Sequence, residues 1–243
     1  MKTVLITGSA RGIGAATAAL FADSGYNVII NYNTSEAEAL SLCSALEAKG
    51  SKVIAVKADV SKTDEVDFLF RKAKEAFGGV DVLVNNAGIA QQKLFTDITM
   101  QDYDRMFDCN VKSVFNCCQK ALPYMIHNKY GRIINISSMW GITGASCEVH
   151  YSASKAAVIG MTKALAREVA PSGITVNCIA PGVIDTPMNK GFDEETMEAL
   201  KDETPVGRIG TPEEIAKTIL FFADDNSGFI TGQVLSPNGG FVI

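Results

Sequence analysis

The sequence predicts an α/β protein built around a doubly wound, mostly parallel sheet that is flanked by helices. Three observations lead to this fold class. Short apolar runs alternate with amphipathic segments of helical length along the chain. These runs are continuously apolar, as in strands that are buried on both faces of a parallel sheet. A glycine-rich turn follows the first run, at the place where the first strand of a βαβ unit leads into its helix.

Six segments are predicted to be strands because each is a continuous apolar run of strand length. They are Val4–Thr7, Val28–Tyr32, Val53–Lys57, Val82–Asn85, Arg132–Ile136 and Thr175–Ile179. Apolar residues between positions 13 and 21 repeat at helical spacing, and comparable stripes occupy residues 36–49 and 66–77. The alternation of the two patterns predicts successive βαβ units.

Local signals mark where several helices begin. Ser61 with Asp64, and Thr99 with Asp102, have the spacing of capping pairs. The Thr-Pro-Glu-Glu segment at 211–214 places an N-cap, an N1 proline and acidic first-turn residues in order. We therefore expect helices to start near residues 62, 100 and 212.

Size and composition favour one soluble domain. With 243 residues, of which 47% are apolar, a single domain spanning residues 1–243 can bury a large core. The formal charge of −5 leaves no long single-sign run for nucleic acid or a membrane, so neither partner is expected. The lack of a secretory signal and of a span of roughly 20 apolar residues predicts a cytoplasmic location. With only two histidines, no metal is expected.

One long stretch, from Pro181 to Gly210, differs from the rest of the chain. It contains three of the seven prolines and no long apolar repeat. Long connections of this kind inside compact domains are commonly functional. We predict a mobile flap over the site.

The glycine-rich turn is a candidate phosphate-binding loop. Its sequence is Thr7-Gly8-Ser9-Ala10-Arg11-Gly12-Ile13-Gly14. Glycines let the backbone turn tightly there and approach a pyrophosphate held at the helix N-terminus. A plain strand-to-helix turn is the alternative, but the position after the first strand favours a dinucleotide site. The sequence thus predicts a single-domain Rossmann fold.

A second motif carries candidate acid–base groups. Tyr151 and Lys155 are four residues apart, so they project from one face of a helix. Alone, this spacing is most often a solvated surface pair. Ser138, however, ends the fifth predicted strand, at the carboxyl edge where open α/β sheets bind ligands.

These motifs together resemble the short-chain dehydrogenase/reductase family. The loop has the spacing G-x-x-x-G-x-G, Asn85-Asn86-Ala87-Gly88 follows the fourth strand, and the Tyr151–Lys155 segment follows Ser138. Asn110 supplies the fourth catalytic residue that the resemblance calls for. The resemblance extends from Thr3 to Gly240 and implies an enzyme that moves a hydride between a nicotinamide cofactor and a carbonyl or secondary alcohol.

The resemblance also implies which residues hold the cofactor. The glycine loop and the Asn-Asn-Ala-Gly segment would bind its adenosine and phosphates, and Tyr151 and Lys155 its nicotinamide ribose. Asp59 and Val60 match the positions that contact the adenine ring, although Asp59 alone reads as a turn residue before Ser61. The segment that binds the nicotinamide carboxamide is represented by Pro181, Gly182, Ile184 and Thr186.

The catalytic roles follow from the chemistry of carbonyl reduction. The oxygen gains negative charge, so it needs a proton donor and a further hydrogen bond, here Tyr151 and Ser138. A cation about 4 Å away, at an effective dielectric of about 20, contributes roughly 4 kcal/mol, or about three pKa units before desolvation. Lys155 alone is therefore expected to lower the pKa of Tyr151 towards neutrality. The family resemblance implies that Asn110 helps to hold a water molecule in the proton relay.

Cofactor choice is predicted from the end of the second strand. NAD-selective relatives place a carboxylate there to bond the ribose 2′-hydroxyl, whereas this chain has Asn31-Tyr32-Asn33. Arg11 is placed to meet a 2′-phosphate, although an ordinary surface role is the alternative. We expect NADP(H) to be preferred over NAD(H), with Asn31→Asp shifting the preference towards NADH.

Within the family, the chain most resembles the 3-oxoacyl-[acyl-carrier-protein] reductases, through segments 131–138, 166–170 and 173–177. This implies an acyl thioester substrate, with acyl carrier protein as a candidate partner, and a homotetramer built through the helices that carry Asn110 and Tyr151. Ser138, Trp140 and Tyr151 would contact substrate. Candidate oligomer-face residues are Val114, Phe115, Cys118 and Leu122.

Several alternatives stay open at this point. In that subfamily, basic residues beside the mouth of the site dock acyl carrier protein. This chain has one such residue, Lys129, but has Ser172 where an arginine is common. A sugar, polyol, steroid or other ketone is therefore a rival substrate. Trp140 either shapes the substrate pocket or fills core. A dinucleotide-sensing protein without turnover is the rival of another class.

Overall fold

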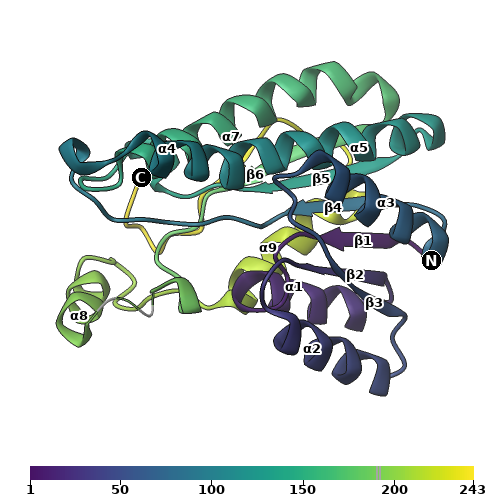
Figure 1. The fold of residues 1–243 in the computed structure, drawn as a ribbon, viewed down its shortest axis with the longest axis horizontal. Helices are drawn as coiled ribbons and strands as arrows, with labels where there is room; N and C mark the ends of the chain where they lie inside the picture. The colour runs from purple at the N-terminus through teal and green to yellow at the C-terminus, as the bar shows by residue number, and fades with distance from the viewer. Residues whose placement is uncertain (190, 192) are drawn as a thin grey trace.

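The computed structural model describes residues 1–189, 191 and 193–243. Its centre is a parallel sheet of seven strands in the order β3-β2-β1-β4-β5-β6-β7 (Figure 1). The strands are β1 (Thr3–Ile6), β2 (Asn27–Tyr32), β3 (Val53–Lys57), β4 (Val82–Asn85), β5 (Gly131–Ile136), β6 (Ile174–Ile179) and β7 (Val234–Leu235). The chain order reverses between β1 and β4, which creates the crevice where such sheets bind ligands. The predicted α/β, doubly wound Rossmann fold is confirmed.

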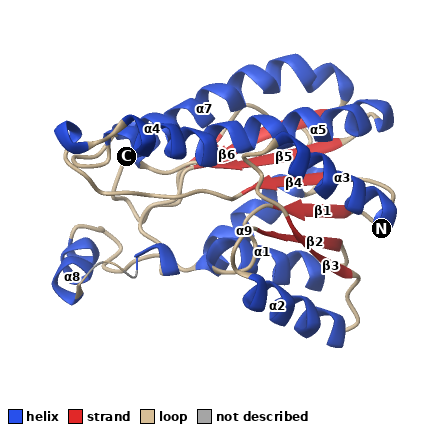
Figure 2. Ribbon diagram, viewed as in Figure 1, coloured by secondary structure: helices blue, strands red, loops and turns tan. Residues whose placement is uncertain are grey.

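Helices cover both faces of the sheet (Figure 2). They are α1 (Gly12–Asp23), α2 (Glu36–Ala48), α3 (Thr63–Phe77), α4 (Met100–Phe107), α5 (Ser113–Asn128), α6 (Trp140–Thr143), α7 (Val149–Val169), α8 (Glu194–Asp202) and α9 (Pro212–Ala223). Helices α1, α2 and α9 pack on one face, and α3, α5 and α7 on the other. Successive strand residues alternate between the two cores: Val4 and Ile6 face one, and Leu5 faces the other.

The six predicted strands are confirmed to within one residue, but β7 was missed. Two residues at a sheet edge are too few to show a period, and Leu235 is exposed. β7 forms only through its pairing with β6, where Cys178 lies opposite Val234. It is a product of tertiary contact.

All three predicted helix starts are confirmed to within one residue, but only two of the three predicted caps form. Thr99 and Thr211 each form a reciprocal capping box with the acidic residue three positions later. The Ser61–Asp64 pair is wrong. α3 begins at Thr63, and the Ser61 hydroxyl instead donates to Asp59 Oδ1 at 2.7 Å. A turn closed by Asp59 therefore competes successfully with capping by Ser61.

The stretch 181–210 leaves the sheet and carries α8, which stands apart from the main body in Figure 1. A parallel bridge between Ile184 and Gly210 joins its two ends. Residues 190 and 192 lie outside the described part, and the mobility of this stretch stays a prediction. No helix in the described residues is long and apolar enough to cross a membrane.

Candidate active site

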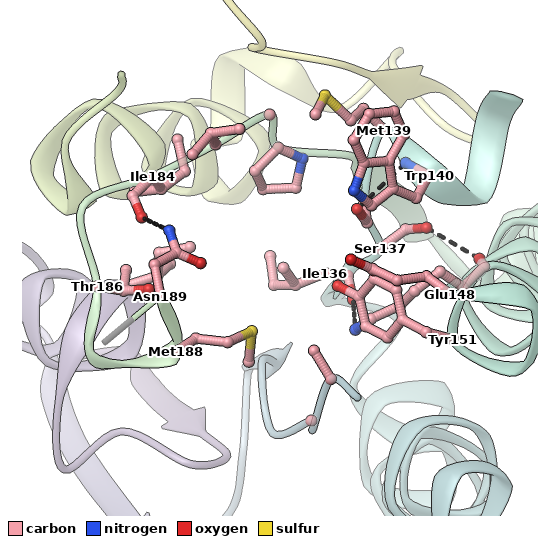
Figure 3. Close-up of a pocket in the computed structure, with 18 of the residues that line it drawn as sticks. Ile136, Ser137, Met139, Trp140, Glu148, Tyr151, Ile184, Thr186, Met188 and Asn189 are labelled. Atoms are coloured by element: carbon pink, nitrogen blue, oxygen red, sulfur yellow. Dashed lines mark hydrogen bonds between the residues drawn. The ribbon is translucent and has the colours of Figure 1, made fainter. Parts of the chain in front are cut away.

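A cavity of about 410 Å³ lies at the carboxyl edge of the sheet. It is enclosed by the ends of β4, β5 and β6, the start of α7 and the stretch 181–210. Among the predicted site residues, its lining includes Ile13, Asn86, Gly88, Ser138, Trp140, Tyr151, Lys155, Pro181, Gly182, Ile184 and Thr186. Figure 3 shows Tyr151 and Glu148 on one side of the cavity and Ile184, Thr186 and Asn189 across from them. The topology thus gathers residues that are more than 170 positions apart in the chain, from Ile13 to Thr186.

Helix α7 positions the two residues of the tyrosine–lysine motif. Tyr151 and Lys155 are 7% and 5% exposed, on one face of the first turns of this helix. The Lys155 ammonium donates a hydrogen bond to the Ile136 carbonyl at 3.0 Å. Its Nζ lies 5.7 Å from the centre of the Tyr151 ring. The surface-pair interpretation of this motif is therefore wrong.

Burial controls the charges of both groups. It raises the pKa of Tyr151 to about 12, while Ser138 acts to lower that pKa and the nearby Glu148 acts to raise it. Burial also lowers the pKa of Lys155 to about 8. The expectation that Lys155 alone brings the pKa of Tyr151 near neutrality is wrong, because desolvation exceeds the attraction of an ammonium that is directed at a carbonyl. Tyr151 therefore carries its proton at neutral pH.

Asn110 lies in a π-helix, Asp108–Lys112, between α4 and α5. Its Oδ1 accepts from the Ile89 backbone N–H at 2.8 Å, and its Nδ2 donates to the Ile89 carbonyl at 2.9 Å. Nδ2 also donates to Ser154 Oγ at 3.0 Å, and Ser154 bonds the Tyr151 carbonyl at 2.7 Å. Asn110 therefore fastens the loop after β4 to α7 and does not itself line the cavity.

The glycine loop and the Asn-Asn-Ala-Gly segment are in contact. Asn86 Nδ2 donates to the carbonyls of Thr7 and Gly8 at 3.0 and 3.1 Å. A Cβ at Gly14 would lie 2.7 Å from that same Nδ2, and one at Gly8, where φ is +61°, would lie 2.9 Å from Ala87 Cα. The open N-terminus of α1 and this side-chain-free cradle fit the pyrophosphate of a nicotinamide dinucleotide.

Two predicted cofactor residues have inward-facing side chains. Ser9 is fully buried, and its hydroxyl donates to the Ile6 carbonyl at 2.8 Å. Asn31 is 1% exposed; its Oδ1 accepts from Gly8 N–H at 3.1 Å, and its Nδ2 donates to the Ala58 carbonyl at 3.0 Å. Asn31→Asp would set a carboxylate against that carbonyl, so this variant is unsuitable for changing cofactor preference.

The other predicted adenosine-side residues differ in exposure. Arg11 and Asn33 are exposed, at the start of α1 and just after β2, and Arg11 has no ion pair in the described part of the chain. Asp59 accepts from Ser61, in agreement with its turn role, and Val60 is buried.

A carboxylate of the next helix approaches the end of β2, although residues 31–33 themselves carry none. The Tyr32 hydroxyl donates to Glu36 Oε1 at 3.2 Å. Glu36 belongs to the next helix, α2, so its approach to β2 depends on how the connecting turn folds.

Thirteen cavity residues were not predicted as site residues, among them Gln91, Gln92, Glu148, Met188, Asn189 and Leu200. Gln91 and Gln92 closely follow the Asn-Asn-Ala-Gly segment, and Glu148 precedes Tyr151 by three residues. This proximity to the motifs is the only local sign in the sequence that they line the cavity. Met139 also lines the cavity but is 1% exposed, whereas Trp140 is half-buried and packs edge-on against Phe241, with ring centres 5.6 Å apart. Trp140 therefore shapes the cavity wall.

Comparisons with known proteins agree with this geometry. A family model described as enoyl-(acyl carrier protein) reductase matches residues 8–242. The 3-oxoacyl-[acyl-carrier-protein] reductase of Staphylococcus aureus is 43% identical over 98% of this chain and 97% of its own length. That of Thermotoga maritima is 43% identical over 100% and 98%.

Relatives with other substrates are similar too. A (2S)-[(R)-hydroxy(phenyl)methyl]succinyl-CoA dehydrogenase subunit of Thauera aromatica is 42% identical over 98% of this chain and 96% of its own. The solved structure of a provisionally assigned gluconate dehydrogenase from Agrobacterium tumefaciens superposes with a TM-score of 0.95 at 32% identity, covering 100% and 97% of the two chains. The chain belongs to the short-chain dehydrogenase/reductase family of oxidoreductases.

Proposed function

We propose that this protein reduces the keto group of a 3-oxoacyl thioester to a secondary alcohol with NADPH. The observation that carries the proposal is the meeting of Ser138, Tyr151 and Lys155 on one cavity that also reaches Ile13 of the glycine loop. A single domain spanning residues 1–243 and a cytoplasmic location belong to the same proposal.

The chain's own groups suit the proton side of this reaction. Nicotinamide dinucleotide, when bound, supplies the hydride. Tyr151, protonated at neutral pH because burial raises its pKa to about 12, donates its proton to the carbonyl oxygen. Ser138 gives that oxygen a second hydrogen bond, and Lys155 holds positive charge close to the phenol. Asn110 acts as a positioning residue, because it fixes the backbone of α7 at Tyr151.

The substrate part of the proposal is supported by the cavity wall and by the named relatives. Trp140, Met188 and Leu200 line the cavity and offer apolar surface to an acyl chain. Initial rates with NADPH and NADH on acetoacetyl thioesters, cyclic ketones and sugars test it. Turnover of a sugar or cyclic ketone in the absence of any thioester turnover would favour a different short-chain reductase.

We expect Arg11→Ala to lower kcat/KM for NADPH by about tenfold to a hundredfold while leaving that for NADH little changed. Hydrogen bonds to charged groups contribute roughly 1.5–3 kcal/mol, and every 1.4 kcal/mol is about tenfold. Initial rates with both cofactors at a fixed substrate concentration measure this. Arg71→Ala, an exposed arginine on α3, serves as the control. A wild type that uses both cofactors equally would contradict the NADP(H) preference.

We further propose that a second copy of this chain covers the outer face of α5 and α7, as in a homotetramer. A groove of about 320 Å³ there is lined by Phe115, Leu122, Met161 and Leu165, and Phe115 is 53% exposed. Val114 was expected on this face, but it is 2% exposed in the monomer's own core, whereas Cys118 lines the groove although it is only 3% exposed. Light scattering of wild type and Phe115→Glu checks the proposal; the variant should have the lower mass.

The acyl-carrier docking expectation needs one correction. Lys129 precedes β5 and lies against Gly173, at the amino edge of the sheet. The cavity opens at the carboxyl edge. Lys129 is therefore not beside the cavity mouth of its own chain, and acyl carrier protein stays a candidate partner without an assigned docking residue.

A further inference from the structure

The cavity wall contains a buried carboxyl group, that of Glu148, whose loss of solvent is offset by few interactions. Glu148 immediately precedes α7, is 8% exposed and lines the cavity. Figure 3 shows it beside Tyr151. In the described part of the chain its carboxyl has one hydrogen bond, from Gln92 Nε2 to Oε1 at 3.3 Å, and no ion pair. A buried carboxyl of this kind calls for an explanation.

Helix capping does not explain it. Glu148 occupies the N-cap position of α7, but its side chain makes no cap hydrogen bond. The backbone carbonyl alone serves the helix, by accepting from Ser152 N–H at 2.8 Å. Burial raises the pKa of Glu148, and the hydrogen bond from Gln92 lowers it by less than burial raises it.

The second carboxyl oxygen of Glu148, a cavity-lining residue, is unpaired and not fully enclosed in the described part of the chain. Oε2 has no hydrogen-bond partner among the described residues, and it is not among their fully enclosed unpaired atoms. A carboxylate oxygen accepts hydrogen bonds and repels other anions. Glu148 lines the same cavity as Ser138 and lies beside Tyr151, so this oxygen is available to a substrate group next to the one that those two residues hold.

We propose that Glu148, oriented by Gln92, is a specificity-determining residue that binds a hydroxyl or other neutral hydrogen-bond donor of the substrate beside the reacting carbonyl. A substrate with a carboxylate at that place is disfavoured. The proposal rests on the proposed function, since it takes Tyr151 as the proton donor to the carbonyl. It narrows the substrate class to oxoacyl compounds with a donor group near the keto carbon.

The test compares two nearly isosteric substrates. 4-Hydroxy-3-oxobutanoyl and 3-oxopentanoyl N-acetylcysteamine thioesters differ by a hydroxyl in place of a methyl group. Wild type should favour the hydroxylated substrate in kcat/KM by about tenfold to a hundredfold, the range for a hydrogen bond to a charged group. The monothioester of 3-oxopentanedioic acid, which carries a carboxylate, should be the poorest of the three.

Glu148→Gln should reduce the hydroxyl-to-methyl ratio at least about fivefold, mainly through KM, and should improve relative use of the carboxylate substrate. Gln92→Ala should shift both ratios in the same direction, and it provides the test if Glu148→Gln does not fold. Glu47→Gln, an exposed glutamate on α2, is the matched control and should keep the wild-type ratios.

The outcomes separate the two proposals. Wild-type turnover with a hydroxyl-to-methyl ratio near one, or ratios unchanged in both site variants, overturns the specificity role and leaves the proposed reduction standing. Failure of wild type to turn over all three thioesters with either cofactor overturns the proposed function, and the subsite with it.

Discussion

Replacing Tyr151 by Phe should lower kcat by about a thousandfold or more and leave the fold intact. The variant loses one oxygen, the proton donor to the carbonyl, together with its hydrogen bond to the developing charge. The phenol hydroxyl that is removed is buried, and burial raises its pKa to about 12. Phenylalanine leaves no unpaired phenol in its place, so the variant should not be destabilised. Steady-state rates on the substrate with the highest wild-type turnover measure the effect.

The control for this variant is Tyr103→Phe, which removes a phenol oxygen from α4, outside the cavity lining. It should retain wild-type rates. Circular dichroism and NADPH fluorescence should be alike for wild type and Tyr151→Phe. Near-full activity in a folded Tyr151→Phe protein would exclude this residue as the proton donor.

Lys155→Met should have opposite effects on activity and stability. We expect kcat/KM to fall at least about a hundredfold, since a fixed positive charge near the reacting oxygen is lost. Burial lowers the pKa of Lys155 from 10.5 to about 8, so keeping the ammonium charged in the folded protein opposes folding by roughly 3 kcal/mol below pH 8. Methionine removes that penalty but also the hydrogen bond to the Ile136 carbonyl. A net gain of about 1–2 kcal/mol at pH 7 is expected.

The sign of the pH dependence distinguishes this explanation from general repacking. Between about pH 8 and 10.5 the unfolded wild type binds more protons at Lys155 than the folded protein does, so wild-type stability rises with pH. The stability gain of Lys155→Met should therefore shrink across this window. Urea unfolding at pH 7 and 10 measures it, with the exposed Lys163→Met on the same helix as control. A gain that is equal at both pH values would contradict the buried-ammonium account.

Several features could be predicted from the sequence because their signals are local. The six longer strands follow from continuous apolar runs, and the Thr99 and Thr211 caps follow from residues three positions apart. The spacing of Tyr151 and Lys155 places both on one face of a helix wherever that helix lies. The cradle at Gly8 and Gly14 is likewise encoded in the residues that form it.

Only the tertiary structure decided the environment of these groups. Enclosure by strands that are distant in the sequence lowers the pKa of Lys155. The effect of this loss of solvent exceeds the electrostatic attraction between Tyr151 and Lys155 that their spacing alone suggests. Asn31 faces inward because Val56 of β3 and the following Ala58 offer it carbonyls, and the two-residue β7 exists only beside β6. Glu148 and Gln92 meet although 56 positions separate them in the chain. Desolvation and contacts between distant residues arise when segments pack together, so a local sequence pattern determines which groups are present but not how strongly they are buried or paired.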